Sequence, residues 1–239
     1  MSGATVDLAD VVYRYREAQA TMSMRFTLHV PAGAFLAVIG PSGAGKSTLL
    51  SLIAGFERPE SGSIRIGGED MAGVPPARRP VSLLFQDHNL FSHLDVWTNV
   101  ALGISPDLRL GPGDRDRVAV ALARVGLAEL DKRKPGELSG GERQRAALAR
   151  ALVRDRPVLL LDEPFAALGP ALRQDMIALL IELQRETGAT AVMVTHQPED
   201  ALAAAGLTAF LDQGRIVALR PTAELLSASD VPGLREYLG

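Results

Sequence analysis

Cysteine is absent from the 239-residue sequence, and only 5 % of its residues are aromatic. Without cysteine there are no disulfides, thiolate metal sites or thiol nucleophiles, and the composition fits a reducing compartment such as the cytoplasm. No run of about 18 apolar residues predicts a transmembrane helix. The N-terminal segment MSGATVDLAD lacks the basic start and apolar stretch of a signal peptide. We therefore expect neither secretion nor a membrane span.

An excess of positive charge is also lacking, because the formal net charge at pH 7 is −3. The chain therefore has no overall cationic field with which to neutralise the phosphates of DNA or RNA, and nucleic acid is not expected as a partner. The hydrophobic content of 47 % is enough for one sizeable core.

The hydrophobic pattern predicts an α/β fold with a mixed sheet. Apolar or alternating segments predict strands at 6–13, 24–30, 35–39, 63–66, 81–85, 158–161, 190–194, 208–211 and 215–218. Helices are predicted at 47–54, at 172–186 and from Glu199 to the glycine at 206. We interpret 63–66 as an antiparallel strand at the sheet edge. A helical pattern covers 94–154, with Asp114 and Ser139 as expected helix caps.

A glycine-rich segment follows the strand predicted at 35–39. It matches G-x-x-x-x-G-K-S and runs into the helix predicted at 47–54. The ATP-binding residues expected here are Gly40, Pro41, Ser42, Gly43, Ala44, Gly45, Lys46, Ser47 and Thr48. In such a loop, backbone N–H groups and the helix N-terminus bind phosphate, the lysine reaches the terminal phosphates, and the serine hydroxyl ligates Mg²⁺. The alternative is a glycine-rich turn with a surface lysine. Its place between strand and helix favours a triphosphate site.

Two carboxylates, Asp162 and Glu163, come directly after the apolar strand at 158–161. Because Gly40 and His196 also follow apolar strands, all are expected to meet at the carboxyl edge of one sheet. Asp162 is then suited to hold Mg²⁺ through water, and Glu163 to accept a proton from an attacking water. The alternative is that the two acids only cap the next helix.

A second glycine pair lies in the segment Leu-Ser-Gly-Gly-Glu, ahead of a helical stretch. Ser139 and Glu142 form an S-x-x-E capping box, which is the structural explanation for the segment. Gly140 and Gly141, however, each cost up to about 1 kcal/mol relative to alanine in a helix. Bare backbone at a helix N-terminus suits close approach by an anion.

In this order, the phosphate loop, Leu-Ser-Gly-Gly-Glu and Leu-Leu-Leu-Asp-Glu-Pro resemble the ATP-binding subunits of ABC transporters, over nearly the whole chain. The resemblance implies a P-loop NTPase of ABC type, with a mixed central sheet, an antiparallel β edge and an inserted helical subdomain. Residues 1–239 then form a single ATP-binding domain. Its nucleotide-binding core comprises 1–87 and 155–239, and 88–154 is the helical subdomain that carries the Leu-Ser-Gly-Gly-Glu motif.

The resemblance also implies ATP and Mg²⁺ as ligands and a second copy of the chain as partner. Two copies would enclose two nucleotides head to tail, so that one copy's Leu-Ser-Gly-Gly-Glu segment contacts ATP held by the other; the contacting residues are Ser139, Gly140, Gly141 and Glu142. The implied catalytic residues are Glu163, His196, Lys46 and Gln86. The implied metal-site residues are Ser47, Gln86 and, through water, Asp162.

Several of these positions have ordinary alternatives when taken singly. Gln86 resembles the glutamine that senses Mg²⁺ and couples to the membrane subunit, but a glutamine is usually only solvated. His196 resembles the histidine at the γ-phosphate, although such a histidine is often structural. Tyr15 resembles the aromatic residue that stacks on adenine, and Tyr13 is close enough in sequence to compete with it.

One position departs from the family pattern. After Glu163 and the following proline, the family usually reads Ser-Ala-Leu-Asp, and that aspartate contacts the opposite phosphate loop. Here the segment ends in Gly169, followed by Pro170. Gly-Pro also makes a good turn before a helix. The resemblance implies that one contact between the two copies is lost.

A lone cassette, without a tandem copy or a long coiled coil, favours a transporter motor over a soluble, non-transport ABC ATPase. Segments including 75–86 and 89–94 resemble the ATP-binding subunits of bacterial thiamine importers; importers for iron, spermidine or sulfate share most motifs and remain alternatives. The implied partners are transmembrane permease subunits and, indirectly, a solute-binding protein, with the chain peripheral on the cytoplasmic face of the inner membrane. The surface around Gln86, Leu90 and Phe91 is a candidate dock for the permease, unless Leu90 and Phe91 are ordinary core.

Overall fold

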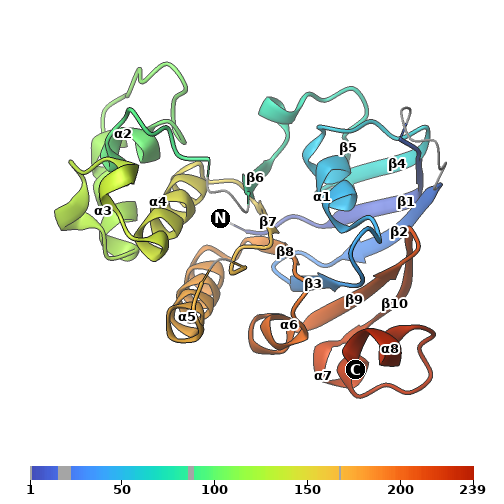
Figure 1. Cartoon of the computed structure of the whole chain (residues 1–239). Helices are drawn as coiled ribbons and strands as arrows, with labels where there is room; N and C mark the ends of the chain where they lie inside the picture. Colours follow the sequence, from blue (N-terminus) through green and yellow to red (C-terminus); the bar gives the residue numbers. More distant parts are fainter. Residues whose placement is uncertain (1, 16–22, 86–88, 167) are drawn as a thin grey trace.

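Ten strands form one continuous sheet in a computed structural model that describes residues 2–15, 23–85, 89–166 and 168–239 (Figure 1). The strand order is β5-β4-β1-β2-β10-β9-β3-β8-β7-β6. The strands are β1 Val6–Tyr13, β2 Met24–Val30, β3 Phe35–Ile39, β4 Ser61–Ile66, β5 Glu69–Asp70, β6 Val81–Leu84, β7 Val158–Asp162, β8 Thr190–Val194, β9 Leu207–Asp212 and β10 Arg215–Pro221.

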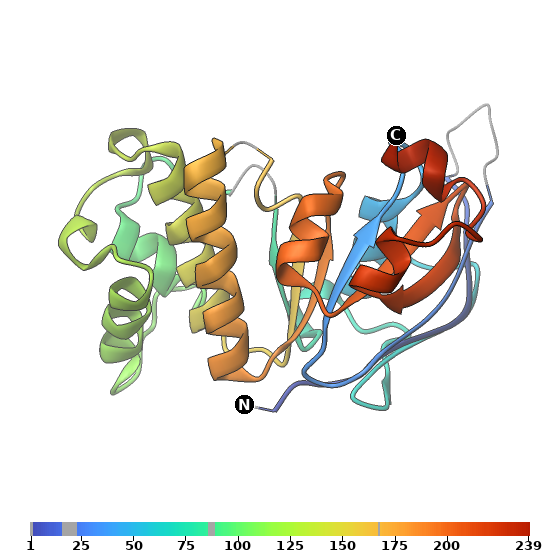
Figure 2. The same ribbon diagram turned by 90° about the horizontal axis from the view of Figure 1, so that it is seen from below.

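Helices cover both faces of this sheet and gather beyond its β6 end. The α-helices are α1 Lys46–Ala54, α2 Val96–Ala101, α3 Asp114–Arg124, α4 Gly140–Val153, α5 Pro170–Thr187, α6 Pro198–Ala204, α7 Thr222–Leu226 and α8 Leu234–Leu238. Short 3₁₀ helices lie at Pro76–Arg78, Ala128–Leu130 and Pro135–Glu137. Figure 1 shows α2, α3 and α4 grouped beside β6, and Figure 2 shows α4 alongside α5. Within the described residues, no helix combines the length and apolarity that crossing a membrane requires.

The sheet is mixed, as predicted. β9, β3, β8, β7 and β6 run parallel, whereas β1, β2, β4 and β5 pair antiparallel. The prediction that 63–66 is the edge strand is wrong, because the two-residue strand β5 pairs outside β4. So short a strand has too few residues to show a periodic pattern.

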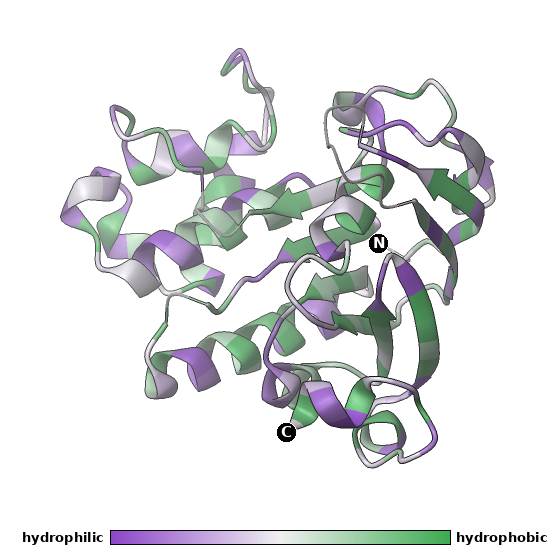
Figure 3. Cartoon of the chain, turned by 45° about the vertical axis from the view of Figure 1, so that its right-hand side comes forward, coloured by the Kyte–Doolittle hydropathy of each residue, from purple (hydrophilic) through white to green (hydrophobic). Residues whose placement is uncertain are grey.

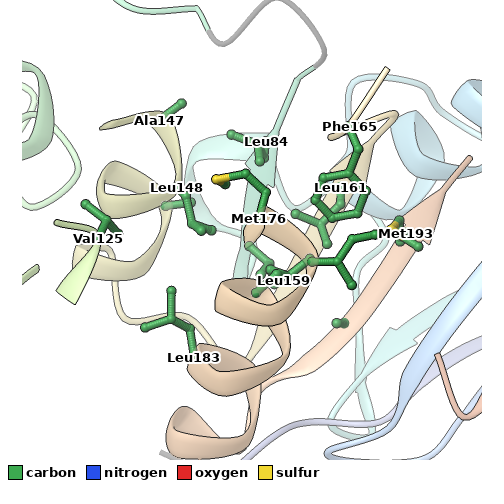
Figure 4. Close-up of a cluster of buried hydrophobic side chains, with 14 of the residues drawn as sticks. Leu84, Val125, Ala147, Leu148, Leu159, Leu161, Phe165, Met176, Leu183 and Met193 are labelled. Carbon is green, nitrogen blue, oxygen red and sulfur yellow. The ribbon is translucent and has the colours of Figure 1, made fainter. Parts of the chain in front are cut away.

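Two hydrophobic cores lie on opposite faces of the parallel strands. Successive side chains of a strand point to opposite faces, so Leu159 and Leu161 of β7 join the core under α4, α5 and α6, whereas Val158 and Leu160 join the core under α1. Figure 4 shows the first core, with Leu159 and Leu161 beside Met176 of α5. Figure 3 shows the matching hydrophobic colour on the strands. Parallel strands buried on both faces explain why these segments are continuously apolar.

Arg79 binds the C-terminal end of α1, the end away from the phosphate loop. Its guanidinium donates to the carbonyl oxygens of Leu52 and Ile53 in the last turn of α1, at 2.7 and 2.8 Å, and to that of Met71 at 3.1 Å. Carbonyls at a helix C-terminus lack intrahelical partners, so this buried cation satisfies them and complements the helix dipole. The helix that follows the phosphate loop is therefore held rigidly at the end away from the loop.

One of the two expected helix caps is wrong. The Ser139 side chain caps α4 as predicted, but α3 is preceded by Gly113 in a left-handed conformation, and Asp114 is its first helical residue. The Asp114 carboxylate instead accepts a hydrogen bond from the Gly111 N–H at 2.8 Å. Asp114 thus remains near the helix N-terminus, where an acidic residue is favourable, without occupying the cap itself.

Candidate functional site

The phosphate loop lies between β3 and α1, where β3 pairs on one side with β9. Gly40 has φ of 152°, and a Cβ there would lie 1.9 Å from the Leu211 carbonyl oxygen. No side chain fits at this point. The glycine therefore lets the loop leave the strand against its neighbour and turn its backbone toward the start of α1.

Lys46 lies over this loop at the first turn of α1. Its ammonium group donates to the carbonyl oxygens of Gly40 and Pro41 at 2.7 and 2.8 Å. Burial lowers the pKa of Lys46, and the charges of Glu163 and Asp162 oppose that shift. With two of its three protons directed at the loop, the ammonium retains one for a phosphate oxygen.

Ser47 and Asp162 bring a hydroxyl and a carboxylate together across the site. The Ser47 Oγ donates to the Asp162 Oδ1 at 3.3 Å. Burial raises the pKa of Asp162, while the hydrogen bond from Ser47 and the charge of Lys46 act in the opposite direction. A buried carboxylate with a raised pKa gains stability in its ionised form when a cation lies beside it.

Mg²⁺ fits this pair by the chemistry of its donors. Mg²⁺ prefers hard oxygen ligands and usually takes one or two from protein, the rest coming from phosphates and water. Ser47 and Asp162 supply such oxygens beside the phosphate loop. Throughout the described ranges, no group of three or more His, Cys, Asp or Glu side chains is arranged to hold a metal ion. The oxygens of Ser47 and Asp162 suit Mg²⁺ whose remaining ligands are phosphate and water.

Glu163 follows β7 in a strained backbone conformation. Its φ is 45°, in the left-handed region that non-glycine residues rarely adopt, and its N–H donates to the Val194 carbonyl at 2.9 Å. Such strain costs on the order of 1–3 kcal/mol and is common at functional sites. The turn directs the carboxylate toward the C-terminal end of β8, the neighbouring strand. There, Glu163 Oε2 lies 2.6 Å from His196 Nδ1.

The imidazole of His196 has a partner on each nitrogen. Nδ1 faces the Glu163 carboxylate, and Nε2 lies 3.4 Å from the side-chain nitrogen of Gln197. These partners assign the proton to Nδ1, which donates to Glu163, while Nε2 accepts from Gln197. The histidine thereby fixes the orientation of the carboxylate.

Tyr15 and Tyr13 differ in how far they are buried. Tyr13 is 7 % exposed and belongs to the core under α1, whereas Tyr15 is 45 % exposed. The two rings pack edge to face, with centroids 5.0 Å apart, and the Tyr15 hydroxyl lies 2.7 Å from the Thr48 Oγ1. Tyr15 therefore presents a ring held at both its edge and its hydroxyl, as a stacking surface for a base requires.

These residues surround a common cavity of about 490 Å³. It is lined by Tyr15, Met24, Ser42, Gly43, Gly45, Lys46, Ser47, Thr48, Glu163 and His196. Met24 was not predicted as part of the site: a Cβ on Gly45 would lie 2.9 Å from its sulfur. Contact between a methionine on β2 and the phosphate loop depends on the folded sheet, and no spacing in the sequence indicates it.

Ser139 and Glu142 lie outside the cavity lining and form the capping box that was predicted. The Ser139 N–H donates to the Glu142 carboxylate at 2.6 Å, and the Glu142 N–H donates to the Ser139 hydroxyl at 3.3 Å. The backbone hydrogen bond from Ser139, with that from its side chain, lowers the pKa of Glu142. The carboxylate is thus kept ionised at the start of α4.

The two glycines of this segment differ in their surroundings. A Cβ on Gly141 would lie 2.4 Å from Leu172 of α5, so Gly141 is needed for the contact between two helices. A Cβ on Gly140 would meet only the Arg143 guanidinium, at 3.9 Å. Packing within the chain therefore explains Gly141 and leaves Gly140 unexplained. The contact with Leu172 gives Gly141 a packing role within the chain, beside the anion contact that the sequence predicts for both glycines.

Gln86, predicted as a metal-site and catalytic residue, lies outside the described residues.

The sequence analysis did not predict an ion pair that lies next to the site. Arg173 of α5 makes two hydrogen bonds of 2.6 Å to Asp200 of α6, and Asp200 accepts from the Thr195 hydroxyl at 3.1 Å. Thr195 precedes His196, so this pair braces the end of β8. The pairing joins residues 27 positions apart in the sequence, which is beyond the reach of local patterns.

Comparison with known proteins finds three kinds of similarity. Residues 24–166 match the family model described as ABC transporter. The chain is 56 % identical over 238 residues to the thiamine import ATP-binding protein ThiQ of Brucella suis, covering 100 % of this chain and 97 % of that protein. It is 58 % identical over 221 residues to ThiQ of Cereibacter sphaeroides, covering 92 % and 95 %.

The fold is similar to that of the ATP-binding cassette MJ0796, solved as a dimer in a post-hydrolysis state bound to ADP and Pi. The TM-score is 0.80 with 29 % sequence identity, and the match covers 91 % of this chain and 98 % of that one.

Proposed function

The chain belongs to the ABC transporter family, and from this premise we propose that it is the ATP-hydrolysing subunit of a bacterial importer whose cargo is thiamine. The observation that supports hydrolysis is the Glu163–His196 pair at 2.6 Å, at the rim of a cavity lined by the phosphate loop. The observation that supports thiamine is the likeness to thiamine import ATP-binding proteins over nearly the whole chain.

Hydrolysis follows from the positions of these side chains. Lys46 and the loop N–H groups bind the phosphates, and bound Mg²⁺, held by Ser47, by Gln86 and through water by Asp162, would neutralise charge on the phosphate oxygens. Glu163 accepts a proton from the attacking water as the water oxygen bonds to the γ-phosphorus. The bond from that phosphorus to the oxygen bridging the β- and γ-phosphates breaks, so that ADP leaves with the electron pair and inorganic phosphate is formed. His196 keeps that carboxylate turned toward the water, and Tyr15 stacks on the adenine.

The remaining contacts to each nucleotide come from a second copy of the chain. We assign this role to Ser139, Gly140, Gly141 and Glu142, at the N-terminus of α4, where backbone N–H groups and the helix dipole favour a phosphate. The dimer of the related cassette, with ADP and Pi bound, supports this assembly. Residues 88–154 then act as a helical subdomain that carries this segment to the partner's ATP.

Gly140→Ala tests the trans contact with little effect on the fold. Alanine raises helix propensity by up to about 1 kcal/mol, so the melting temperature is expected to stay equal or rise, whereas ATPase activity is expected to fall about tenfold or more. Gly136→Ala is the matched control, because Gly136 is exposed, lies outside the proposed contact and has nothing among the described residues within 4 Å of a Cβ. Gly141→Ala is not a control, since its methyl group would collide with Leu172 and is expected to lower stability by about 1–3 kcal/mol. Full ATPase activity in Gly140→Ala would contradict the contact.

Gly169 allows a second test of coupling between the two copies. It is the N-cap residue of α5, with φ of −68°, and among the described residues nothing lies within 4 Å of the position that a Cβ would occupy. Gly169→Asp therefore fits without strain and adds a favourable cap. We expect it to raise the ATPase rate about two- to tenfold, or its cooperativity, by adding a charged contact to the opposite phosphate loop. Gly169→Asn, which caps α5 without a charge, is the control; steady-state kinetics equal to the parent in both variants would refute the idea.

Three exposed aromatic side chains support docking to a permease. Phe56, Phe85 and Phe91 are 57 %, 37 % and 49 % exposed, and the first two rings lie 6.1 Å apart. Leu90, by contrast, packs partly buried against the core under α4. We infer that a short helix of the membrane subunit binds these rings and that the chain is peripheral on the cytoplasmic face of the inner membrane.

Co-purification with the neighbouring membrane subunit tests the proposed function as a whole. We expect a stable complex whose ATPase is stimulated by thiamine delivered by a solute-binding protein, and loss of that complex in Phe91→Asp. Leu202→Asp, at an exposed leucine on α6, is the matched control. Stimulation by iron, spermidine or sulfate instead would correct the cargo, and a chain that hydrolyses ATP but forms no complex with the membrane subunit would favour a soluble ABC ATPase.

A further inference from the structure

Tyr237 brings the C-terminal end of the described chain to the nucleotide site. This residue belongs to α8, outside residues 24–166 that match the family model. Its hydroxyl donates to the carbonyl oxygen of His196 at 2.9 Å. A side chain from the last helix thus holds the backbone of a residue that contacts Glu163.

The sheet itself determines where this tyrosine lies. β3 and β9 pair in parallel with Ile39 opposite Phe210, and the Phe210 ring contacts the Tyr237 ring, with centroids 5.7 Å apart. Leu234 anchors α8, because its side chain is fully buried. Ile39 is the last residue before the phosphate loop, and Phe210 lies opposite it. Because the Tyr237 ring packs on Phe210, the Tyr237 hydroxyl lies near the start of that loop.

The hydroxyl also lies beside the phosphate loop. Burial raises the pKa of Tyr237, and the backbone N–H of Gly40 acts in the opposite direction by hydrogen bonding to the phenolic oxygen. A tyrosine hydroxyl has one donor and can accept as well. While it donates to the His196 carbonyl, the hydroxyl therefore lies beside Gly40, the first residue of the phosphate loop.

We propose that Tyr237 is a positioning residue for ATP hydrolysis: its hydroxyl holds the His196 backbone and thereby keeps the imidazole against Glu163. The inference rests on the proposed ATPase function. Thr195, on the other side of His196, is held separately by Asp200 at 3.1 Å. Tyr237 is therefore the described side chain that holds the His196 carbonyl itself.

Tyr237→Phe removes the hydroxyl while keeping the ring on Phe210. In the full-length protein we expect kcat to fall about three- to tenfold, the effect of losing one ordinary hydrogen bond in the transition state. The KM for ATP should stay within about twofold, because the loss concerns the transition state and not nucleotide binding. Amide hydrogen exchange in the peptide that contains His196 and Gln197 should become faster. Glu236→Ala, an exposed change on the same helix, is expected to behave like the parent.

Three results would overturn the inference. One is an unchanged kcat in Tyr237→Phe. Another is a fall in kcat accompanied by an equal loss of thermal stability, which would make the hydroxyl merely structural. The third is a rise in KM with kcat unchanged. Absence of ATP hydrolysis in the parent and in Glu236→Ala would instead reject the proposed function, so the two failures are distinguishable.

Discussion

Glu163→Gln is expected to reduce ATP turnover by at least about 100-fold, because a general base contributes on the order of 10²–10⁴ in rate. The amide keeps the shape of the carboxylate, and its oxygen still accepts a hydrogen bond from His196 Nδ1, which lies 2.6 Å from the native carboxylate. It lacks the basicity to take a proton from water. Nucleotide binding should therefore survive while hydrolysis stops.

The same variant should accumulate as an ATP-bound dimer. If γ-phosphate contacts from the opposite Ser139 segment close the two copies, then blocking hydrolysis prevents their release. Light scattering in ATP and Mg²⁺ should give twice the mass measured without nucleotide. Glu199→Gln, the same change at a nearby exposed glutamate on α6, is the control and should turn over ATP normally. A Glu163→Gln protein that stays monomeric in saturating ATP would count against the two-copy site.

Lys46→Ala is expected to weaken ATP binding about 10- to 100-fold and to lower hydrolysis further. A hydrogen bond to a charged group contributes about 1.5–3 kcal/mol, and the lysine of a phosphate loop binds the terminal phosphates. Lys46→Arg should not restore activity, because a planar guanidinium does not fit the place of a buried ammonium that donates to Gly40 and Pro41. Titration calorimetry and a steady-state ATPase assay measure the two effects separately.

The thermal stability of Lys46→Ala, unlike its activity, is not expected to fall. Burial lowers the pKa of Lys46, which means that the folded protein disfavours its charge relative to the unfolded chain. Removing that charge is expected to leave the melting temperature equal or higher, as for other residues that are retained for function at the expense of stability. A large drop in melting temperature would instead indicate that lost activity comes from unfolding.

Residue patterns predicted much of the fold because burial repeats regularly along the central strands. The bounds predicted for 6–13, 24–30, 35–39 and 190–194 are those of β1, β2, β3 and β8. What was missed lies in pieces too short to be periodic, such as β5 and α8. Asp114 was misplaced because a glycine and an aspartate can each begin a helix, and only the backbone conformation decides between them.

The site was predictable to the extent that its residues follow strands. Lys46, Asp162, Glu163 and His196 were expected to converge and do lie around one place. Contacts across long sequence separations could not be predicted. Leu172 beside Gly141 and Tyr237 beside His196 depend on how helices pack, which no local spacing specifies.

The pairing of the three central strands also limits how such a chain can change over evolutionary time. Val194 of β8 lies opposite Val38 of β3 and opposite Asp162 of β7, so three loops leave the sheet at one level. Inserting one residue into any of these strands would shift its loop by about 3.3 Å and turn its side chains to the other face. Insertions are therefore tolerable in outlying turns, whereas the lengths of β3, β7 and β8 are constrained as a set.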